Sequence, residues 1–190
     1  MPLFNNGLLP NVDSHPGFKP GNYYLHTPNC STTTNSTNVL VANSLIYTPV
    51  FVPRRATIDR LGIRTIAAIA GSLSRIGIYN NSLEGLPSSL LFDAGELDTS
   101  SVNFKECIVN RSLDIGWYWL AANCNVAPNL QISNTYFGSL YYLGFSGPLA
   151  SANSYCYQQP SVSYGALPTV APVTALINKS NFPLFWFRVA

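Results

Sequence analysis

Charged side chains are scarce in this sequence of 190 residues. Lys, Arg, Asp and Glu together make up 9% of it, whereas an ordinary globular domain carries about 25%. A monomer with so few charges would have a poorly solvated surface. We therefore expect much of the surface to be buried against other chains, and Asn, Ser, Thr and Tyr to solvate the rest.

Several kinds of segment are also absent. The net charge is +2 and no basic run exceeds Arg54-Arg55, so the sequence has no electrostatic footprint for nucleic acid. No apolar run is long enough for a membrane-spanning helix, and residues 1–6 lack the basic and apolar regions of a signal peptide. We expect synthesis in the cytoplasm, no membrane insertion and no nucleic-acid partner.

Residues typical of catalysis are few. The two histidines, His15 and His26, both lie in the first forty residues, which are rich in turn dipeptides, so we expect both to be exposed. No nucleophile elbow, phosphate-binding loop or dinucleotide fingerprint occurs. The sequence therefore predicts no enzyme and no cofactor.

Four acidic residues leave two alternatives open. A glycosidase needs two facing carboxylates, and a calcium site needs several oxygen ligands at close spacing. The acidic residues near one another in sequence are Asp93, Glu96, Asp98 and Glu106. They lie in or beside turns, where Asp is common for structural reasons, so we favour plain loops over a depolymerase or a metal site.

The four cysteines form no C-x-x-C pair, which argues against a zinc or redox motif. They are Cys30, Cys107, Cys124 and Cys156. Two disulfides are possible in principle, but cytosolic synthesis disfavours them. We expect free thiols that act as small apolar residues.

Short β-type segments with turns between them fill residues 41–190, which predicts one all-β domain, a β-sandwich of jelly-roll or Ig-like topology. Residues 1–40 predict an extended N-terminal arm with short β pieces that docks on a partner or a neighbouring subunit. The expected strands cover residues 46–52, 57–66, 74–79, 89–94, 103–109, 116–122, 140–145, 154–164 and 184–189.

Side-chain alternation predicts which faces are buried. In residues 57–66, Leu61 and Ile63 share one face and the two arginines Arg60 and Arg64 share the other with Gly62. Residues 117–120 are apolar on both faces, which indicates a central strand with one face in the core and the other against a second surface. The apolar segment 182–189 would be a liability if exposed, so we expect it to be paired inside a sheet.

Two Tyr-rich stretches have the makeup of a sugar site, because an aromatic face stacks on a sugar ring and amides bond its hydroxyls. The candidate glycan contacts are Tyr141, Tyr142, Tyr155 and Tyr157. The same residues would also suit a core or a subunit interface, where Tyr is enriched.

Over roughly residues 40–190 the chain resembles a module of tailed-bacteriophage virion proteins. The motifs are Ile58-Asp59-Arg60-Leu61-Gly62-Ile63, Ser74-Arg75-Ile76-Gly77-Ile78-Tyr79, Gly85-Leu86-Pro87-Ser88-Ser89-Leu90-Leu91, Gly116-Trp117-Tyr118-Trp119-Leu120-Ala121, Tyr164-Gly165-Ala166-Leu167-Pro168 and Phe187-Arg188-Val189-Ala190. Residues 123–137 depart from it, since they are more Asn-rich and less regular than the module leads us to expect.

The resemblance implies a structural virion protein on the exterior of a tailed phage. It favours the tail over the head as the location. We expect a tail-fibre or receptor-binding protein that attaches to host cell-surface glycans as a homo-oligomer, by implication a trimer. The arm would dock on other virion proteins. The alternative is a capsid decoration protein that stabilises the head.

Overall fold

The computed structural model describes residues 17–26, 33–36, 39–133 and 156–190. These residues form strands and loops without any helix, so among them no helix could span a membrane. The strands are β1 (Tyr23–Leu25), β2 (Thr33–Ser36), β3 (Leu45–Val52), β4 (Ala56–Ala67), β5 (Leu73–Asn81), β6 (Pro87–Asp98), β7 (Asn103–Leu113), β8 (Gly116–Cys124), β9 (Asn129–Ser133), β10 (Cys156–Gln159), β11 (Ile177–Lys179), β12 (Phe182–Pro183) and β13 (Trp186–Val189).

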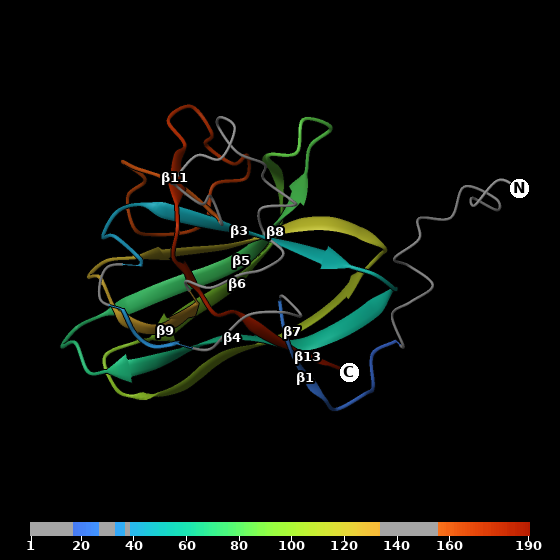
Figure 1. Cartoon of the computed structure of the whole chain (residues 1–190), viewed down its shortest axis with the longest axis horizontal. Helices are drawn as coiled ribbons and strands as arrows, with labels where there is room; N and C mark the ends of the chain where they lie inside the picture. Colours follow the sequence, from blue (N-terminus) through green and yellow to red (C-terminus); the bar gives the residue numbers. More distant parts are fainter. Residues whose placement is uncertain (1–16, 27–32, 37–38, 134–155) are drawn as a thin grey trace, which may run out of the picture.

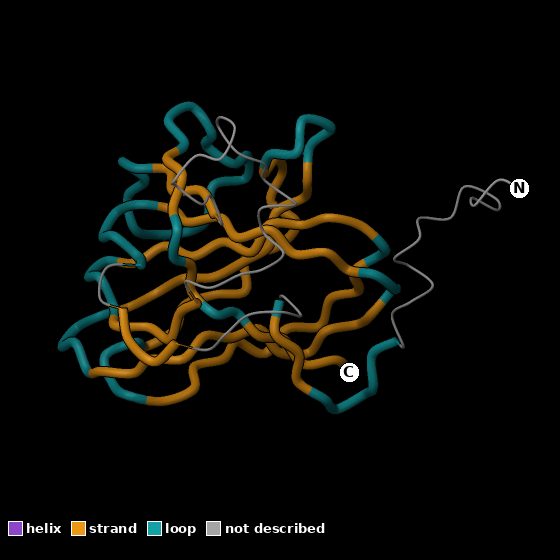
Figure 2. Tube along the Cα trace, viewed as in Figure 1, coloured by secondary structure: helices purple, strands orange, loops and turns teal. Residues whose placement is uncertain are grey.

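The strands form two antiparallel sheets that face each other in a sandwich-like arrangement (Figure 1). The six-stranded sheet has the order β11-β10-β3-β8-β5-β6. The seven-stranded sheet runs β1-β13-β4-β9-β12, with β2 on β9 and β7 on β4, and it is strongly curled. Figure 2 shows strands throughout both layers, with loops at both ends of them. The predicted all-β sandwich is thus confirmed.

Strand β4 organises the seven-stranded sheet because three strands pair with it. On one edge β13 lies opposite Ile58–Gly62 and β9 lies opposite Thr65 and Ala67. The other edge pairs with β7 over nearly the whole length of β4. Its buried Leu61 and Ile63 face the other sheet, while Arg60 and Arg64 face outward, as the alternation predicts.

The inner core lies between the sheets. Aliphatic side chains of β3, β4, β5 and β8 meet there with the aromatic residues of the last strands. Phe182, Phe185 and Phe187 all belong to this core, and β13 is hydrogen-bonded between β1 and β4. The prediction that the apolar segment 182–189 is paired inside a sheet is confirmed.

A second, outer core covers the far face of the six-stranded sheet. Trp119 and Ala121 of β8 belong to it, whereas their neighbours Leu120 and Ala122 belong to the inner core. Strand β8 lies between β3 and β5. The expectation of a central strand with two buried faces is therefore confirmed, and the second surface is a loop of the same chain.

We call that loop, residues 160–176, the covering segment. Its Leu167 and Ala171 pack on the outer core. Two tyrosines of the sheet bond its backbone: the Tyr79 hydroxyl donates to the Pro168 carbonyl at 2.8 Å, and the Tyr47 hydroxyl donates to the Pro172 carbonyl at 3.3 Å. These bonds hold a segment with little regular structure on an apolar sheet face.

The sequence also led to expectations that the structure revises. Strand β9 lies in residues 123–137, where the sequence predicted no strand, and within the described part of the strand expected over 154–164 only Cys156–Gln159 is a strand. The strand expected over 140–145 lies outside the described residues. The predicted arm contributes β1 and β2 to the seven-stranded sheet, and its docking role stays a prediction.

Three of the cysteines are free and buried, as expected: Cys107, Cys124 and Cys156. Burial raises the pKa of the Cys107 thiol to about 11 and that of Cys124 to about 12. These thiols are therefore protonated at neutral pH and behave as apolar packing groups. Cys30 lies outside the described residues.

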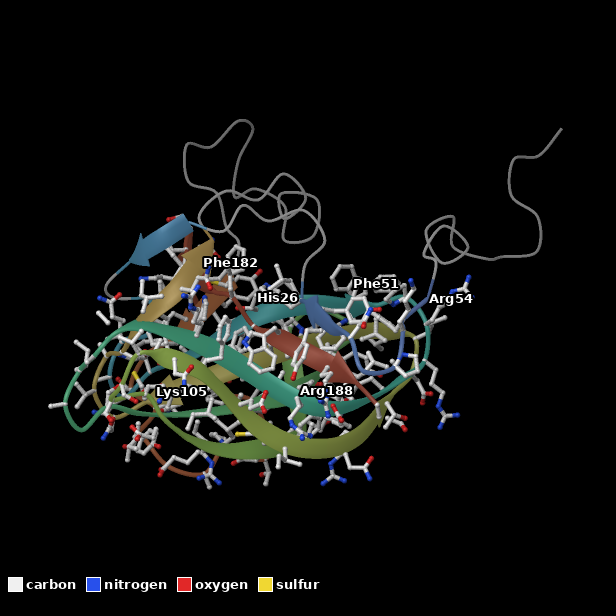
Figure 3. All side chains as sticks on the ribbon, turned by 90° about the horizontal axis from the view of Figure 1, so that it is seen from below. His26, Phe51, Arg54, Lys105, Phe182 and Arg188 are labelled. Carbon is white, nitrogen blue, oxygen red and sulfur yellow. The ribbon has the colours of Figure 1, made fainter. Side chains whose placement is uncertain are left out.

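The expectation that His26 is exposed is wrong. Its side chain is only 5% exposed, and its ring lies edge-on to Phe182, 5.3 Å between centroids (Figure 3). Nδ1 donates to the Phe185 carbonyl oxygen at 3.1 Å. Burial lowers the pKa of His26 to about 4, although this hydrogen bond opposes the shift. His15 lies outside the described residues.

Burial of neutral His26 makes stability depend on pH. The unfolded chain binds a proton at His26 below pH 6.5, while the folded chain binds it only near pH 4. The free energy of unfolding should therefore fall as pH drops below 6.5, by roughly 1.4 kcal/mol per pH unit and about 3 kcal/mol in all. Denaturant unfolding of the wild type and of His26→Phe across this pH range checks it. An equal slope in both proteins would contradict the buried neutral histidine.

Candidate functional site

The outer face of the seven-stranded sheet carries the candidate site. Antiparallel register sets side chains of four strands into rows across this face. One row contains Leu25 of β1, Trp186 of β13, Gly62 of β4 and Glu106 of β7. A neighbouring row contains Tyr23 of β1 and Arg188 of β13. Another row contains Arg64 of β4 and Phe104 of β7.

Trp186 forms the floor of the site by lying across Gly62. A Cβ built on Gly62 would come within 2.3 Å of Trp186 Cζ2 and within 2.5 Å of the Lys105 carbonyl oxygen. Only glycine leaves room for the indole at this position. Trp186 is 8% exposed, and its buried N–H has no hydrogen-bond partner among the residues that the structure describes. The sheet thus holds a large aromatic ring flat on its backbone.

Tyr23 and Phe104 stand on either side of this floor. Their ring centroids lie 5.3 Å and 6.5 Å from that of Trp186, and both rings are tilted steeply to the indole. Tyr23 is 55% exposed and Phe104 is 60% exposed. Together with neighbouring side chains they enclose a groove of about 470 Å³, which is lined by Tyr23, Tyr24, Leu25, Phe104, Glu106, Gln131, Leu184 and Trp186.

Arginines border the aromatic walls. The Arg188 guanidinium lies 5.7 Å from the Tyr23 ring centroid, and that of Arg64 lies 4.9 Å from the Phe104 ring centroid. Such contacts are cation–π interactions, and they restrict the motion of exposed rings. Figure 3 looks onto this side of the molecule, where Arg188 lies on β13 beside β4. The walls are therefore supported as well as exposed.

Two carboxylates near the groove pair with Arg188 and with a third arginine, Arg60. Arg188 binds both oxygens of Asp59, with a 2.8 Å bond from its Nε, and Arg60 Nε lies 3.4 Å from Glu106 Oε1. Hydrogen bonding by Arg188, more than its charge, holds the pKa of the Asp59 carboxyl below its ordinary value. The rim of the groove is therefore polar, and its three arginines outnumber its two carboxylates by one charge.

This arrangement can bind a ring-shaped ligand. Exposed aromatic rings stack on the apolar faces of a ring-shaped ligand, while Glu106 and Gln131 supply acceptors and donors for its hydroxyl groups. The described lining includes neither a histidine nor a cysteine that could act as a base or nucleophile. Among the described residues no group of three acidic, His or Cys side chains could hold a metal ion.

The acidic residues considered for a carboxylate pair have separate partners. Asp93 accepts from Arg75 Nε at 2.6 Å and from the Leu167 backbone N–H at 3.0 Å. Glu96 accepts from the Tyr164 hydroxyl at 2.6 Å. Asp98 caps the backbone of Ser100. Asp93 and Glu96 thus help to anchor the covering segment, and Glu106 belongs to the groove.

Of the four tyrosines predicted as glycan contacts, the structure describes Tyr157; Tyr141, Tyr142 and Tyr155 lie outside the described residues. Tyr157 in β10 is half-buried, and its ring centroid lies 5.5 Å from that of Trp119. It packs against the outer core, far in the topology from the Trp186 groove. A role for Tyr157 in glycan binding stays a prediction.

Sequence reasoning did not find the groove. Its walls come from β1, β7 and β13, which lie far apart in the sequence. The available signal was Gly62 in an otherwise β-branched and charged strand, since a glycine inside a strand often marks a close approach by another group. Nothing in the sequence identified Trp186 as that group.

Comparison with known proteins gave no match to a protein-family model, to a curated protein or to a solved structure. The likeness to phage virion modules therefore stays a resemblance of motifs.

The contact between Trp186 and Gly62 can be tested directly. Gly62→Ala should lower the free energy of unfolding by about 1–3 kcal/mol, because the added methyl group overlaps the indole and the Lys105 carbonyl. The same substitution in a Trp186→Leu background should cost less, since one of the two clashes is relieved. Urea unfolding of the four proteins of this cycle measures the difference. Equal costs in both backgrounds would show that the indole does not lie on Gly62.

Proposed function

We propose that this protein is a structural virion component of a tailed bacteriophage, a tail-fibre or receptor-binding protein that attaches to host-surface glycans. The observation that carries the proposal is the groove floored by Trp186 and walled by Tyr23 and Phe104. Three aromatic rings around a cavity of about 470 Å³ with amide and carboxylate groups at its edge match the chemistry of a sugar ring. The resemblance of motifs supplies the virion context.

The mechanism is multivalent adhesion without chemical change of the ligand. One open groove of this size binds a sugar weakly, because few side chains contact the ligand. Several copies in one oligomer, and many oligomers on one particle, multiply that affinity through effective concentration. The low charge content supports the oligomer, since a chain with only 9% charged residues has few charges to solvate its surface, which favours burial between chains.

A capsid decoration protein is the second candidate. Leu25, Phe104 and Ile108 are exposed apolar residues on one sheet face, and such a face also suits a protein surface. The two functions differ in location on the particle. Immunogold electron microscopy with antibody against residues 41–190 places the label on the tail tip for adhesion, and evenly over the head for decoration.

Glycan binding should depend on the walls of the groove. On a glycan array, and by titration with the best ligand, Tyr23→Ala and Phe104→Ala should each weaken binding by roughly tenfold, the effect expected for loss of one stacking or hot-spot contact. Both residues are largely exposed, so the thermal unfolding midpoint should change little.

The matched control is Leu83→Ala, which removes a fully exposed apolar side chain at the turn between β5 and β6. It should bind like the wild type. A wild-type oligomer that binds no glycan on the array, or wall variants that bind as well as the control, would exclude the groove as the attachment site.

A further inference from the structure

Strand β7 has an open edge. One of its sides pairs with β4, and within the described part of the chain no strand pairs with the other side. The strand is 11 residues long and contains no proline. Phe104 and Ile108, at 60% and 76% exposure, project from it. An open strand of this kind presents a row of backbone donors and acceptors to other strands.

The position of Lys105 shows which backbone groups face the open side. Its carbonyl oxygen lies against Gly62, so it points toward β4. In an antiparallel strand the N–H and C=O groups of one residue point to the same side, and those of the next residue point to the other side. The backbone groups of Phe104, Glu106 and Ile108 therefore point away from β4. The Phe104 N–H is already bonded to Asn103 Oδ1 at 2.8 Å. Within the described part of the chain, the donors that stay free on the Phe104–Ile108 edge are therefore the N–H groups of Glu106 and Ile108.

The edges of the six-stranded sheet are partly protected by comparison. Strand β11 is three residues long. The first part of β6 is bonded to the covering segment: the Leu90 N–H donates to the Thr169 carbonyl, and the Ala171 N–H donates to the Ser88 carbonyl. Short or covered edges resist pairing with other chains. The Phe104–Ile108 part of β7 has neither protection.

A second copy of β7 fits this edge in one register. Antiparallel pairing about a two-fold axis at Cys107 places Glu106 opposite Ile108 of the other copy. The N–H of each of these residues then donates to the backbone carbonyl oxygen of the other. The register centred on Glu106 would set two carboxylates opposite each other and would need the capped Phe104 N–H. Register and charge therefore both favour the Cys107-centred register over the Glu106-centred one, and in it the apolar side chains Phe104 and Ile108 of both copies share the outer face.

We propose that two copies of this protein associate through β7, edge to edge, with Glu106 and Ile108 as the hydrogen-bonded pair. The two seven-stranded sheets then form one continuous sheet. Because the two-fold axis is perpendicular to that sheet, both Trp186 grooves open on the same side. The association rests on backbone groups, so it holds whether or not the groove binds glycans.

The wild-type protein gives the first test. Light scattering after size exclusion, from about 1 to 100 µM, should show mass that rises with concentration toward a dimer or a multiple of one. Hydrogen exchange should show the Glu106 and Ile108 amides becoming protected as concentration rises. A monomer throughout this range, or an oligomer of any order in which these two amides exchange freely, overturns the proposal.

The second test removes one donor. Ile108→Pro deletes an N–H that points away from β4, so the intramolecular ladder stays intact while each dimer loses two hydrogen bonds. Dissociation should become at least tenfold more favourable. Ile108→Thr, which keeps the N–H and the β-branched shape, is the matched control and should associate nearly as the wild type does. Equal association by both variants, with unfolding curves like the wild type, contradicts pairing through β7; should the proline variant not fold, the exchange measurement decides.

Discussion

The seven-stranded sheet depends on the close packing of β13 on β4. Trp186 lies across the backbone of β4 at Gly62. Two residues further along β13, Arg188 donates two hydrogen bonds to the Asp59 carboxylate. Between them Phe187 points to the inner core. One four-residue strand thus contributes to the groove, to the ion pairs of the rim and to the core. Strand β1 in turn pairs with β13. Tyr23 therefore reaches its position beside the groove only when β13 is paired with β4.

Local pattern was sufficient to predict the elements that alternate clearly. The faces of β4 and the two buried faces of β8 follow from side-chain spacing, because the period of a strand fixes which residues share a side. Strand β9 was missed because Asn-rich sequence such as residues 123–137 also suits turns. His26 was misjudged because its burial is produced by Phe182 and Phe185, which lie far along the chain.

The candidate site could not be predicted for a related reason. Its row of Leu25, Trp186, Gly62 and Glu106 exists only through the registers of three strand pairs. Registers between distant strands are set by packing of the whole sheet, which spacing along the chain does not reveal. The sequence does show a glycine, Gly62, at the position where a side chain would clash. It does not show that Trp186 is the group that lies there.

The small number of charges has a physical explanation that composition alone did not provide. Part of the apolar surface is covered within the chain itself, since the covering segment buries the far face of the six-stranded sheet. The exposed apolar residues Tyr23, Leu25, Phe104 and Ile108 gather instead on β1 and β7. The two sheets therefore differ, because the chain's own loop packs on the far face of the six-stranded sheet while these four side chains of β1 and β7 stay exposed.

The position of β13 between β1 and β4 also bears on how the protein folds during translation. The ribosome makes β1 and β4 long before it makes β13. While the intervening strands emerge, the edge of β4 that later pairs with β13 is therefore incompletely paired. Sheets closed by contacts so distant in sequence form slowly, and the waiting edge is prone to join other nascent chains. Chaperone binding to the nascent chain would be most useful during this interval, before residues 186–189 leave the exit tunnel.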